Sequence, residues 1–322
     1  MKNIQIAGSG YALPSHCVTN HDLAAVVDTS HDWIVTRTGI HTRYLSRAEN
    51  TADLGRRAAQ QAIENAGIDK NKIDLIIVAT MTADNFTPST ACLIQEKLGL
   101  NGNHVMAFDV NAACSGFLYA THIAAAMLGQ YSCALVIGAE TLSKLVDWTD
   151  RNTCVLFGDG AGAVIMEKTD TDKQFHFFAQ SIGDSAGTLQ AAGLPLHPPL
   201  QNTQKSYGYL QMDGNEVFRF AIKSMEDGIR QALSMADKSI DDIDLIIPHQ
   251  ANMRIIAHVA RKMGVDISRF YTNLDKYGNT SAASIAMAFA QAQQEGVLKQ
   301  GMKVILVGFG GGFTYGSAYM EL

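Results

Sequence analysis

The chain has few cysteines, and their arrangement excludes two common structural roles. Its 322 residues include five cysteines, an odd number with no Cys-X-X-Cys pair. This pattern argues against a disulfide framework and against a zinc site. For any one of them the default interpretation is a small buried hydrophobe in a reducing, cytoplasmic protein. The five are Cys17, Cys92, Cys114, Cys133 and Cys154.

Other absences narrow the class of protein. No run of about eighteen apolar residues occurs, so we expect no membrane span. Residues 1–7 lack the length and order of a signal peptide and predict a first strand. The formal charge of −6 predicts no general attraction to nucleic acid. No HExxH motif, P-loop or metal-spaced cluster is found, so neither a metal nor a resident cofactor is expected. The 47% of hydrophobic residues is enough for a large core.

The chain contains an internal repeat. Residues 58–77 read AAQQAIENAGIDKNKIDLII and residues 228–247 read GIRQALSMADKSIDDIDLII; each predicts an amphipathic helix, a polar turn and a strand. Ile73 and Ile243 lie 170 positions apart, as do the segments ALVIG and VILVG that begin at Ala134 and Val304. One offset shared by two strands indicates a duplicated unit, and two copies predict two similar halves packed together.

Each half alternates helices with strands, which predicts an α/β fold. Apolar runs such as DLIIV and VILVG are typical of strands covered on both faces. We predict one half over residues 1–170 and the other over 171–322, with the longest irregular loop at 184–212. The expected strands lie near 3–9, 73–79, 105–110, 133–139, 161–167, 174–182, 243–247, 270–274, 303–309 and 315–321. The expected helices lie near 52–66, 89–98, 114–129, 214–235, 251–263 and 281–295.

Cys114 differs from the other cysteines in its position. The predicted strand MAFDV ends shortly before it, and the apolar helix FLYATHIAAAML follows. A thiol at such a turn lies near a helix N-terminus, where the dipole and free amides favour thiolate and lower the pKa. The same amides can stabilise an oxyanion. The offset of 170 maps Cys114 onto Ser284, so the second half keeps the geometry without the nucleophile.

Two further polar residues are candidates for chemistry, each with a structural alternative. His249 follows the strand IDLII and Pro248, and the C-terminal end of a strand often faces a crevice. A structural histidine is the alternative. Asn279 lies in YGNTSAAS, where a turn or a helix cap also explains an asparagine. The Gly-rich segment 158–162 runs into a predicted strand rather than a helix, so we expect no phosphate loop there.

The motifs AACSGF, PHQAN, YGNTSAA and GFGGGFTYGSA occur in this order. They resemble those of the thiolase-superfamily condensing enzymes, most closely the beta-ketoacyl-acyl carrier protein synthase III family. HDWIVTRTGI and DRNTCVLFGDGAGA extend the resemblance over essentially the whole chain. The resemblance implies a thiolase-like, five-layered αβαβα fold with two duplicated halves, and a homodimer. It also implies that Cys114, His249 and Asn279 are the catalytic residues.

The implied reaction has two half-reactions. Cys114 takes an acyl group from an acyl-CoA, with acetyl-CoA as the expected donor. Malonyl-acyl carrier protein then loses carbon dioxide and attacks the acyl-enzyme, giving a 3-oxoacyl-acyl carrier protein that starts type II fatty acid synthesis. Coenzyme A is therefore a substrate and not a cofactor. Two alternatives stay open: a condensing enzyme that primes polyketide synthesis or takes longer acyl chains, and a catalytically inactive partner subunit.

The resemblance also assigns roles around the nucleophile. Decarboxylation builds negative charge on the malonyl thioester oxygen, so the Nε2–H of His249 and the side-chain amide of Asn279 suit the site as neutral donors. The backbone amides of Cys114 and Gly311 are expected to form an oxyanion hole. The acyl pocket is expected to be lined by Phe309, Leu142, Leu156, Leu189 and, from the partner subunit, Phe86.

A coenzyme A site is expected beside a short predicted helix at 30–37. Trp33 and Arg37 are four residues apart and so share a face of that helix. By the resemblance, Trp33 and Arg151 hold the adenine between them through stacking and cation–π attraction. A partly buried anchor is the structural alternative for Trp33. The pantetheine and phosphate path is expected to be lined by Arg37, Gly214, Phe218 and Asn252.

The acyl carrier protein is strongly acidic, and this chain also carries a net negative charge. Binding is therefore expected to require a local basic face on this chain. The predicted helix 251–263 carries its basic residues on adjoining turns, away from its apolar residues. These basic residues are Arg254, His258, Arg261 and Lys262, and Arg219 extends the patch. The structural alternative is an ordinary solvated helix face.

Overall fold

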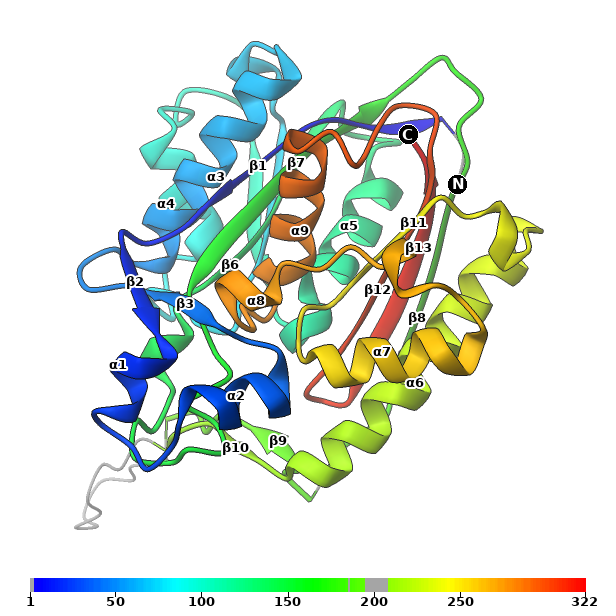
Figure 1. Cartoon of the computed structure of the whole chain (residues 1–322). Helices are drawn as coiled ribbons and strands as arrows, with labels where there is room; N and C mark the ends of the chain where they lie inside the picture. The colour runs from blue at the N-terminus through cyan, green and yellow to red at the C-terminus, as the bar shows by residue number, and fades with distance from the viewer. Residues whose placement is uncertain (1–2, 185, 195–207) are drawn as a thin grey trace.

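The elements of the protein form five layers, in the order helices, sheet, helices, sheet, helices (Figure 1). The computed structural model describes residues 3–184, 186–194 and 208–322. Helices cover both faces of each sheet, so the central strands are buried on both sides. All residues of β4 (Leu75–Ala79) are buried, for example. The five-layered αβαβα architecture expected from the sequence is confirmed.

The first sheet has five strands in the order β1-β7-β6-β4-β5. β4 is parallel to β5 and β6, whereas β7 is antiparallel to β6 and β1. Its outer face is covered by α3 (Thr51–Ala66) and α4 (Thr90–Lys97). The buried face of α3 is rich in alanine, which lets this helix lie close to the strands. The other strands are β1 (Ile4–Ala12), β5 (Met106–Val110), β6 (Cys133–Glu140) and β7 (Gly160–Lys168).

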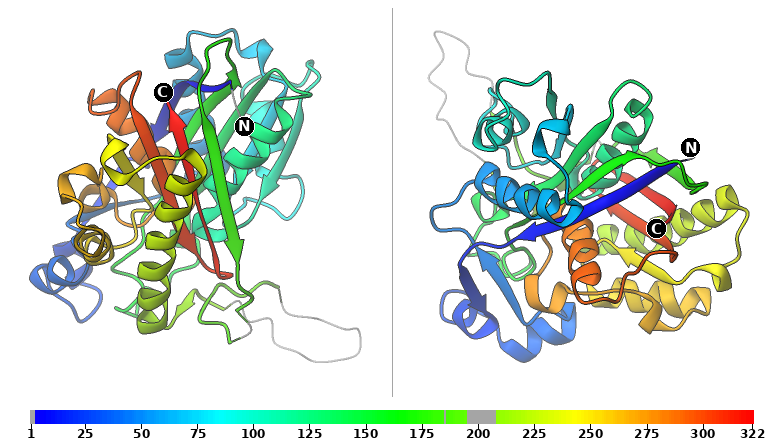
Figure 2. Two further views of the ribbon diagram at one scale, coloured as in Figure 1. Left: turned by 90° about the vertical axis from the view of Figure 1, so that its right-hand side faces the viewer. Right: turned by 90° about the horizontal axis from the view of Figure 1, so that it is seen from above.

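The second sheet repeats four of these five strands, in the order β11-β12-β13-β8, and has no counterpart of β5 among the described residues. β11 is parallel to β12, and the other neighbours are antiparallel. Leu75 pairs with Ala134 in the first sheet and Leu245 with Val304 in the second, so the repeat offset also holds for the strand register. α6 (Gly214–Ala236) covers the outer face with α7 (Met253–Met263) beside it (Figure 2). The strands are β8 (Phe175–Ser181), β11 (Leu245–Pro248), β12 (Lys303–Gly310) and β13 (Thr314–Glu321).

The middle layer consists of α5 (Gly116–Met127) and α9 (Ala283–Gln294), and each contacts strands of both sheets. Residues 283–292 of α9 are all buried, as expected for a helix surrounded by protein. The approach is close: a Cβ on Gly138 of β6 would lie 2.3 Å from the carbonyl oxygen of Ala282. The two halves are therefore interlocked, because a helix of the second half packs on a sheet of the first. The predicted boundary at 170/171 lies between β7 and β8.

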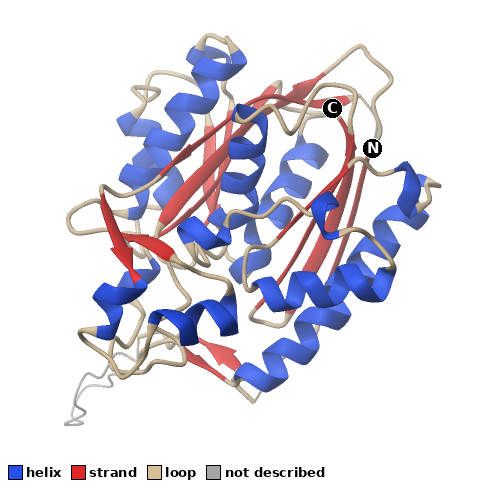
Figure 3. Ribbon diagram, viewed as in Figure 1, coloured by secondary structure: helices blue, strands red, loops and turns tan. Residues whose placement is uncertain are grey.

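Short elements complete the fold (Figure 3). β2 pairs with β3, and β9 pairs with β10. None of the described helices has the length and apolar character that a membrane span needs. The short strands and helices are β2 (His16–Thr19), β3 (Thr42–Leu45), β9 (Leu189–Gln190), β10 (Gln211–Met212), α1 (Asn20–Ala24), α2 (His31–Thr38) and α8 (Leu274–Tyr277). The single-turn helices are η1 (Lys70–Lys72), η2 (Ala113–Ser115), η3 (Leu142–Lys144), η4 (Ile240–Asp242) and η5 (Ile267–Arg269).

The strand predicted at 270–274 was wrong. Phe270 makes only an isolated bridge to Ile246, and α8 begins at Leu274. The side chain of Gln250 takes the place of a neighbouring strand, since it donates to the carbonyl of Tyr271 at 3.1 Å and accepts the N–H of Asn273 at 2.9 Å. The predicted loop at 184–212 contains β9 and β10, and its residues 185 and 195–207 lie outside the described residues.

Candidate active site

A cavity of about 120 Å³ lies between the two halves of the protein. Cys114, His249 and Asn279 all line it. Cys114 lies in η2 just before α5, His249 follows β11, and Asn279 lies between α8 and α9. Most of the other lining residues are aliphatic or aromatic, so the cavity resembles a small-molecule site with a few polar groups.

The backbone around Cys114 is strained and tightly enclosed. Ala113 has a φ of 46°, in the left-handed region that residues other than glycine rarely adopt. β12 approaches so closely that a Cβ on Gly310 would lie 2.6 Å from the amide nitrogen of Cys114. The thiol is thereby fixed in the cavity wall, and Cys114 is only 8% exposed.

The Cys114 thiol is protonated in the free protein. Burial raises its pKa to about 12, and the nearby Glu140 carboxylate adds to the rise, whereas hydrogen bonding by Ser281 lowers it. The expected lowering of the pKa is not found, because the loss of thiolate hydration outweighs hydrogen bonding by Ser281 and by the backbone of Cys114. Any reaction of this thiol must therefore include a route for its proton.

Hydrogen bonds fix the ring of His249. Its Nδ1 lies 2.7 Å from the hydroxyl oxygen of Ser284. The N–H of Gln250 donates to the same oxygen at 3.5 Å, and a hydroxyl that accepts this bond can still donate its hydrogen to Nδ1. Nδ1 is then an acceptor, and the ring carries its proton on Nε2. Burial lowers the pKa of His249 to about 3, so the ring is neutral near pH 7.

Asn279 is held by both its backbone and its side chain. Its N–H donates to the carbonyl of Leu156 at 2.9 Å, and its carbonyl accepts the N–H of Gly158 at 3.0 Å. Its side-chain oxygen accepts the N–H of Ser281 at 2.9 Å. The turn role expected as the structural alternative is therefore real. Because that oxygen is used, the NH₂ group is the end of the amide that can donate into the cavity.

The three side chains together offer one nucleophile and two uncharged donors. An uncharged donor held in place stabilises an oxygen most when that oxygen gains negative charge. Both an enolate and a tetrahedral intermediate carry such an oxygen. The low pKa of His249 keeps it from acting as a cation, and its Nε2–H still donates. The arrangement therefore suits acyl transfer to sulfur followed by a step through an enolate.

The residues predicted for the oxyanion hole and the acyl pocket fall into two groups. Gly311 lines the cavity together with Leu142, Leu156, Leu189 and Phe309. The ring of Phe309 meets that of His249 edge-on, with 5.2 Å between centroids. Phe86, by contrast, is 86% exposed at the surface of its own chain. It does not line the cavity of its own chain, and its role in the pocket of a partner subunit stays a prediction.

The residues predicted to bind coenzyme A, except Arg151, line a polar groove that opens from the cavity. Gly214, Phe218 and Asn252 line both the groove and the cavity, which makes the two spaces continuous. Asn252 caps α7 by accepting the N–H of Arg254 at 2.8 Å. Its side-chain NH₂ donates to the carbonyl of Arg37 at 3.1 Å and so ties α2 to α7.

Two arginines lie over the ring of Trp33 on α2. The guanidinium carbons of Arg37 and Arg151 are 5.7 and 5.1 Å from the ring centroid. Arg151 also pairs with Asp28 at 3.6 Å. A spacing of 5.1 Å is too short for a base to lie between Trp33 and Arg151. An adenine can stack there only if Arg151 swings outward, which its 45% side-chain exposure permits.

The residues of the predicted basic face lie on α6 and α7. They differ in whether they already contact an acidic side chain or an aromatic ring. Arg254 lies over the ring of Phe218, 5.6 Å from its centroid. Lys262 pairs with Glu226 at 2.6 Å, and Arg219 pairs with Glu216 at 2.6 Å. Arg261 is exposed, and no ion pair is found for it among the described residues.

Sequence reasoning missed several residues that shape the site. Ser281 fixes the amide of Asn279, and its φ of 48° is again left-handed. Ser284 was recognised only as the counterpart of Cys114, not as the partner of His249. Glu140 carried a signal that was overlooked, because it is a carboxylate at the end of the otherwise apolar segment CALVIGAE.

The remaining cysteines divide evenly between interior and surface. Cys133 and Cys154 are buried, as expected for small hydrophobes. Cys17 and Cys92 are exposed, which that expectation did not foresee. Both lie on outer elements of the fold, β2 and α4.

Comparisons with known proteins agree on one family. Residues 108–186 match the family model "3-Oxoacyl-[acyl-carrier-protein (ACP)] synthase III", and residues 233–322 match the model of its C-terminal part. The chain is 47% identical to a Clostridium perfringens protein named beta-ketoacyl-[acyl-carrier-protein] synthase III, with 100% of both chains covered.

Solved structures give the same result. The crystal structure of 3-oxoacyl-[acyl-carrier-protein] synthase III from Aquifex aeolicus superposes with a TM-score of 0.91 at 41% identity, covering 99% of this chain and 100% of that one. The priming beta-ketosynthase of the R1128 polyketide pathway superposes with a TM-score of 0.91 at 32% identity, covering 99% of this chain and 96% of that one.

Proposed function

The chain belongs to the beta-ketoacyl-[acyl-carrier-protein] synthase III family, and we propose that it condenses an acyl-CoA with malonyl-acyl carrier protein to start type II fatty acid synthesis. It is thus an acyltransferase of the condensing type. The observation that carries the proposal is that a buried thiol shares one cavity with two neutral donors. These are Cys114, His249 through Nε2–H, and Asn279 through its NH₂ group.

In the first half-reaction the sulfur of Cys114 attacks the thioester carbonyl of the acyl-CoA. The bond from the carbonyl carbon to the coenzyme A sulfur breaks, and an acyl-enzyme forms. The amide N–H groups of Cys114 and Gly311 stabilise the oxyanion of the tetrahedral intermediate. Coenzyme A is held in the groove, with its adenine against Trp33 and its pantetheine arm beside Phe218.

In the second half-reaction malonyl-acyl carrier protein replaces coenzyme A. Its terminal carboxylate leaves as carbon dioxide, and the electron pair passes into an enolate whose oxygen accepts hydrogen bonds from His249 and Asn279. The enolate carbon attacks the acyl-enzyme carbonyl and expels the Cys114 thiolate. The product is a 3-oxoacyl-acyl carrier protein.

The proposal is tested by the mass of the carrier protein after incubation with acetyl-CoA and malonyl-acyl carrier protein. We expect the 3-oxobutanoyl form with the wild-type enzyme and no product with Cys114→Ala. His249→Ala and Asn279→Ala should each slow condensation by about 10²–10³-fold, since each removes one donor to a developing anion, while acylation of Cys114 persists. A wild-type enzyme that leaves the malonyl carrier protein unchanged would refute the function.

A second candidate within the same chemistry is the priming of polyketide synthesis or the use of longer acyl chains. The 32% identical priming ketosynthase with a TM-score of 0.91 is the observation in its favour. Acylation rates with acetyl-, isobutyryl- and octanoyl-CoA separate the two candidates. We expect acetyl-CoA to react fastest, and a preference for octanoyl-CoA would favour the alternative.

We propose that the exposed arginines on α6 and α7 dock the acidic carrier protein. Arg261 is the most informative position, because Lys262 and Arg219 have acidic partners in the chain and Arg254 lies against Phe218. Arg261→Glu should raise the KM for malonyl-acyl carrier protein and leave acylation by acyl-CoA unchanged. Lys299→Glu, on the loop between α9 and β12, makes the same charge change elsewhere and should alter neither step. Equal loss in both steps for Arg261→Glu would count against docking there.

We further propose a homodimer, formed at the first sheet. Its edge strand β5 has a free side, and Met106 on that strand is 44% exposed. A cytoplasmic location suits a nucleophile that must stay a reduced thiol. The proposed chemistry needs no metal and no resident cofactor, because the thioester substrates supply the reactive groups. Neither nucleic acid nor membrane is a proposed partner.

A further inference from the structure

Gln250 is a fully buried polar residue that does not line the cavity, although it directly follows His249 in the chain. Its side-chain NH₂ group donates to the carbonyls of Pro248 at 2.7 Å and Tyr271 at 3.1 Å. Its side-chain oxygen accepts the backbone N–H of Asn273 at 2.9 Å. The orientation of the amide is therefore fixed, because turning it over would place its oxygen against both carbonyls. Removal of this side chain would leave three backbone groups without their partner.

These bonds join two segments of the chain, and the first of them leads into His249. The carbonyl of Pro248 and the N–H of His249 belong to one peptide unit. That N–H donates to the carbonyl of Val307 on β12 at 2.8 Å, while the carbonyl accepts the side chain of Gln250 at 2.7 Å. The peptide unit from which His249 departs is therefore held at both of its polar ends.

The second segment runs from Asn273 to Asn279 through hydrogen-bonded turns. The carbonyl of Asn273 accepts the N–H of Tyr277 at 3.3 Å, which closes the short helix α8. The N–H of Gly278 then donates to the carbonyl of Leu274 at 2.9 Å. Because this short path is held by its own hydrogen bonds, a displacement of Asn273 is passed on to Asn279.

Helix α9 closes the connection between the two segments. The side-chain NH₂ group of Asn273 donates to Oε1 of Gln291 on that helix at 2.9 Å. Ser284, near the start of the same helix, lies 2.7 Å from Nδ1 of His249 and accepts the N–H of Gln250 at 3.5 Å. The two segments and α9 therefore form one connected set of contacts, in which Gln250 touches all three parts.

We propose that Gln250 is a positioning residue for the second half-reaction, because it holds the segments that carry His249 and Asn279 at a fixed spacing. An enolate oxygen is stabilised most when both donors reach it at once, so this step is sensitive to that spacing. The first half-reaction depends instead on the thiol and on the amides of Cys114 and Gly311. The side-chain bonds of Gln250 reach neither of these amides. This inference rests on the condensing function proposed above.

The test measures the two half-reactions separately in Gln250→Met, which keeps the length of the side chain and removes its three hydrogen bonds. The enzyme is acetylated on Cys114 with acetyl-CoA, and the acetyl-enzyme is then mixed with malonyl-acyl carrier protein at several concentrations. We expect acetylation within about twofold of the wild-type rate and a maximal rate of acetyl transfer lower by about 10–100-fold, since a displacement of about 1 Å suffices for such a loss. The half-saturating concentration of the carrier protein should not change. Only acetylated molecules enter the second measurement, so unfolded protein does not contribute to it.

Gln250→Glu adds a readout that a simple packing defect would not change. The carboxylate can accept the N–H of Asn273, but it has no hydrogen to donate to the carbonyls of Pro248 and Tyr271. Burial raises the pKa of such a carboxyl group, and its neutral form regains one O–H donor. Acetyl transfer in this variant should therefore recover relative to wild type as the pH falls, while the ratio of the acetylation rates stays constant. His249 does not titrate in this range, because burial lowers its pKa to about 3.

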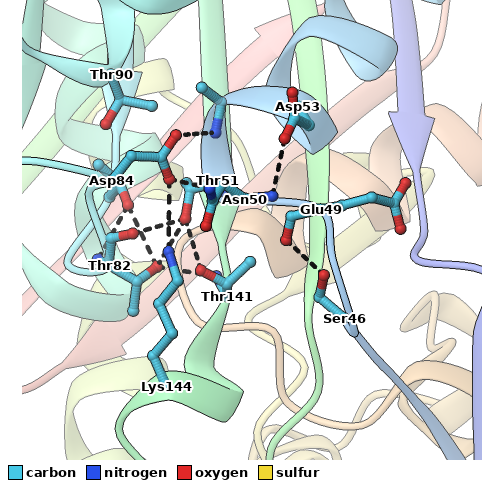
Figure 4. A network of polar contacts seen from close by, with 12 residues as sticks. Ser46, Glu49, Asn50, Thr51, Asp53, Thr82, Asp84, Thr90, Thr141 and Lys144 are labelled. Atoms are coloured by element: carbon cyan, nitrogen blue, oxygen red, sulfur yellow. Dashed lines mark hydrogen bonds and ion pairs between the residues drawn. The ribbon is translucent and has the colours of Figure 1, made fainter.

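Thr51→Val is the matched control, because Thr51 is equally buried and belongs to a polar network of the first half (Figure 4). Its hydroxyl donates to the carbonyl of Thr82 at 2.6 Å and lies 2.7 Å from the hydroxyl oxygen of Thr141. This variant should be less stable, but the ratio of its two rates should equal that of wild type. Equal loss in both half-reactions of Gln250→Met, or wild-type rates in both, would overturn the positioning role. A wild-type acetyl-enzyme that forms no product would instead count against the proposed function.

Discussion

At the scale of single residues, the chemistry of the site depends on which atoms carry hydrogen. Asn279 presents its NH₂ group because the backbone N–H of Ser281 donates to its oxygen, and a Ser284 hydroxyl that donates to Nδ1 leaves the Nε2–H of His249 free. Burial reinforces this arrangement by holding the pKa of His249 far below its usual value. Contacts from two serines therefore leave an N–H donor free on each side chain, as the proposed reaction requires.

The role of Ser284 leads to a prediction for the second half-reaction. Ser284→Ala leaves Nδ1 of His249 without a donor, so the ring is free to carry its proton on Nδ1 and lose the Nε2–H. The barrier to release of carbon dioxide from malonyl-acyl carrier protein should rise by about 1–3 kcal/mol, which slows this step by roughly 5–150-fold. The acylation rate of Cys114 should stay the same. Ser284→Thr keeps a hydroxyl and should restore much of the rate; equal loss in both steps would show a general packing defect instead.

At the scale of elements, close contact between the halves holds the catalytic turns in place. Ser281 and Asn279 lie just before α9, and that helix presses against β6 where Gly138 has no side chain. Cys114 is held similarly, because β12 passes its amide at Gly310. The positions of the catalytic residues therefore depend on contacts between strands and helices far apart in the chain.

Gly138→Ala tests this contact. The added Cβ would lie 2.3 Å from the carbonyl oxygen of Ala282, so α9 must shift away from the sheet. We expect a loss of about 1–3 kcal/mol in the free energy of unfolding, measured by urea denaturation, together with lower condensing activity. Gly129→Ala, at a position with nothing within 4 Å of the added Cβ, is the matched control and should change neither. A Gly138→Ala variant as stable as that control would contradict the packing described.

The elements also show what sequence could predict. Buried strands such as β6 and the turn at Cys114 were predictable, because runs of apolar residues and their spacing are local signals. The false strand at 270–274 was not avoidable, since the side chain of distant Gln250 satisfies that backbone. The thiol pKa was predicted with the wrong sign for a similar reason. Its cause is burial and the charge of Glu140, and both arise only on folding.

At the scale of the whole molecule, the two halves share an architecture but contribute different side chains to the cavity. Four strands of the first sheet follow the same order as the four of the second, and β4–β6 and β11–β12 share their register, while Cys114 of one half corresponds to Ser284 of the other. The cavity between the halves collects Cys114 from the first and His249 and Asn279 from the second. Phe86 is 86% exposed, so it is accessible for the proposed contact with a second copy of the chain.

Phe86 gives a prediction for the assembled enzyme. If Phe86 closes the acyl pocket of the partner subunit, Phe86→Ala should enlarge that pocket and raise the relative acylation rate with octanoyl-CoA over acetyl-CoA. Sedimentation velocity should show two chains per particle for both wild type and variant. Wild-type particles of one chain, or an unchanged chain-length profile in a dimeric variant, would contradict this role.

The central claim is that Cys114 carries an acyl group from coenzyme A to a new carbon–carbon bond. The most direct test is a single-turnover chase: the enzyme is acetylated with labelled acetyl-CoA, freed of excess substrate, and mixed with malonyl-acyl carrier protein. Peptide mass spectrometry should find the acetyl group on Cys114 before mixing, and afterwards the label should appear in 3-oxobutanoyl-acyl carrier protein. Absence of an acetyl adduct on Cys114, or label that remains on the enzyme after mixing, would contradict the claim.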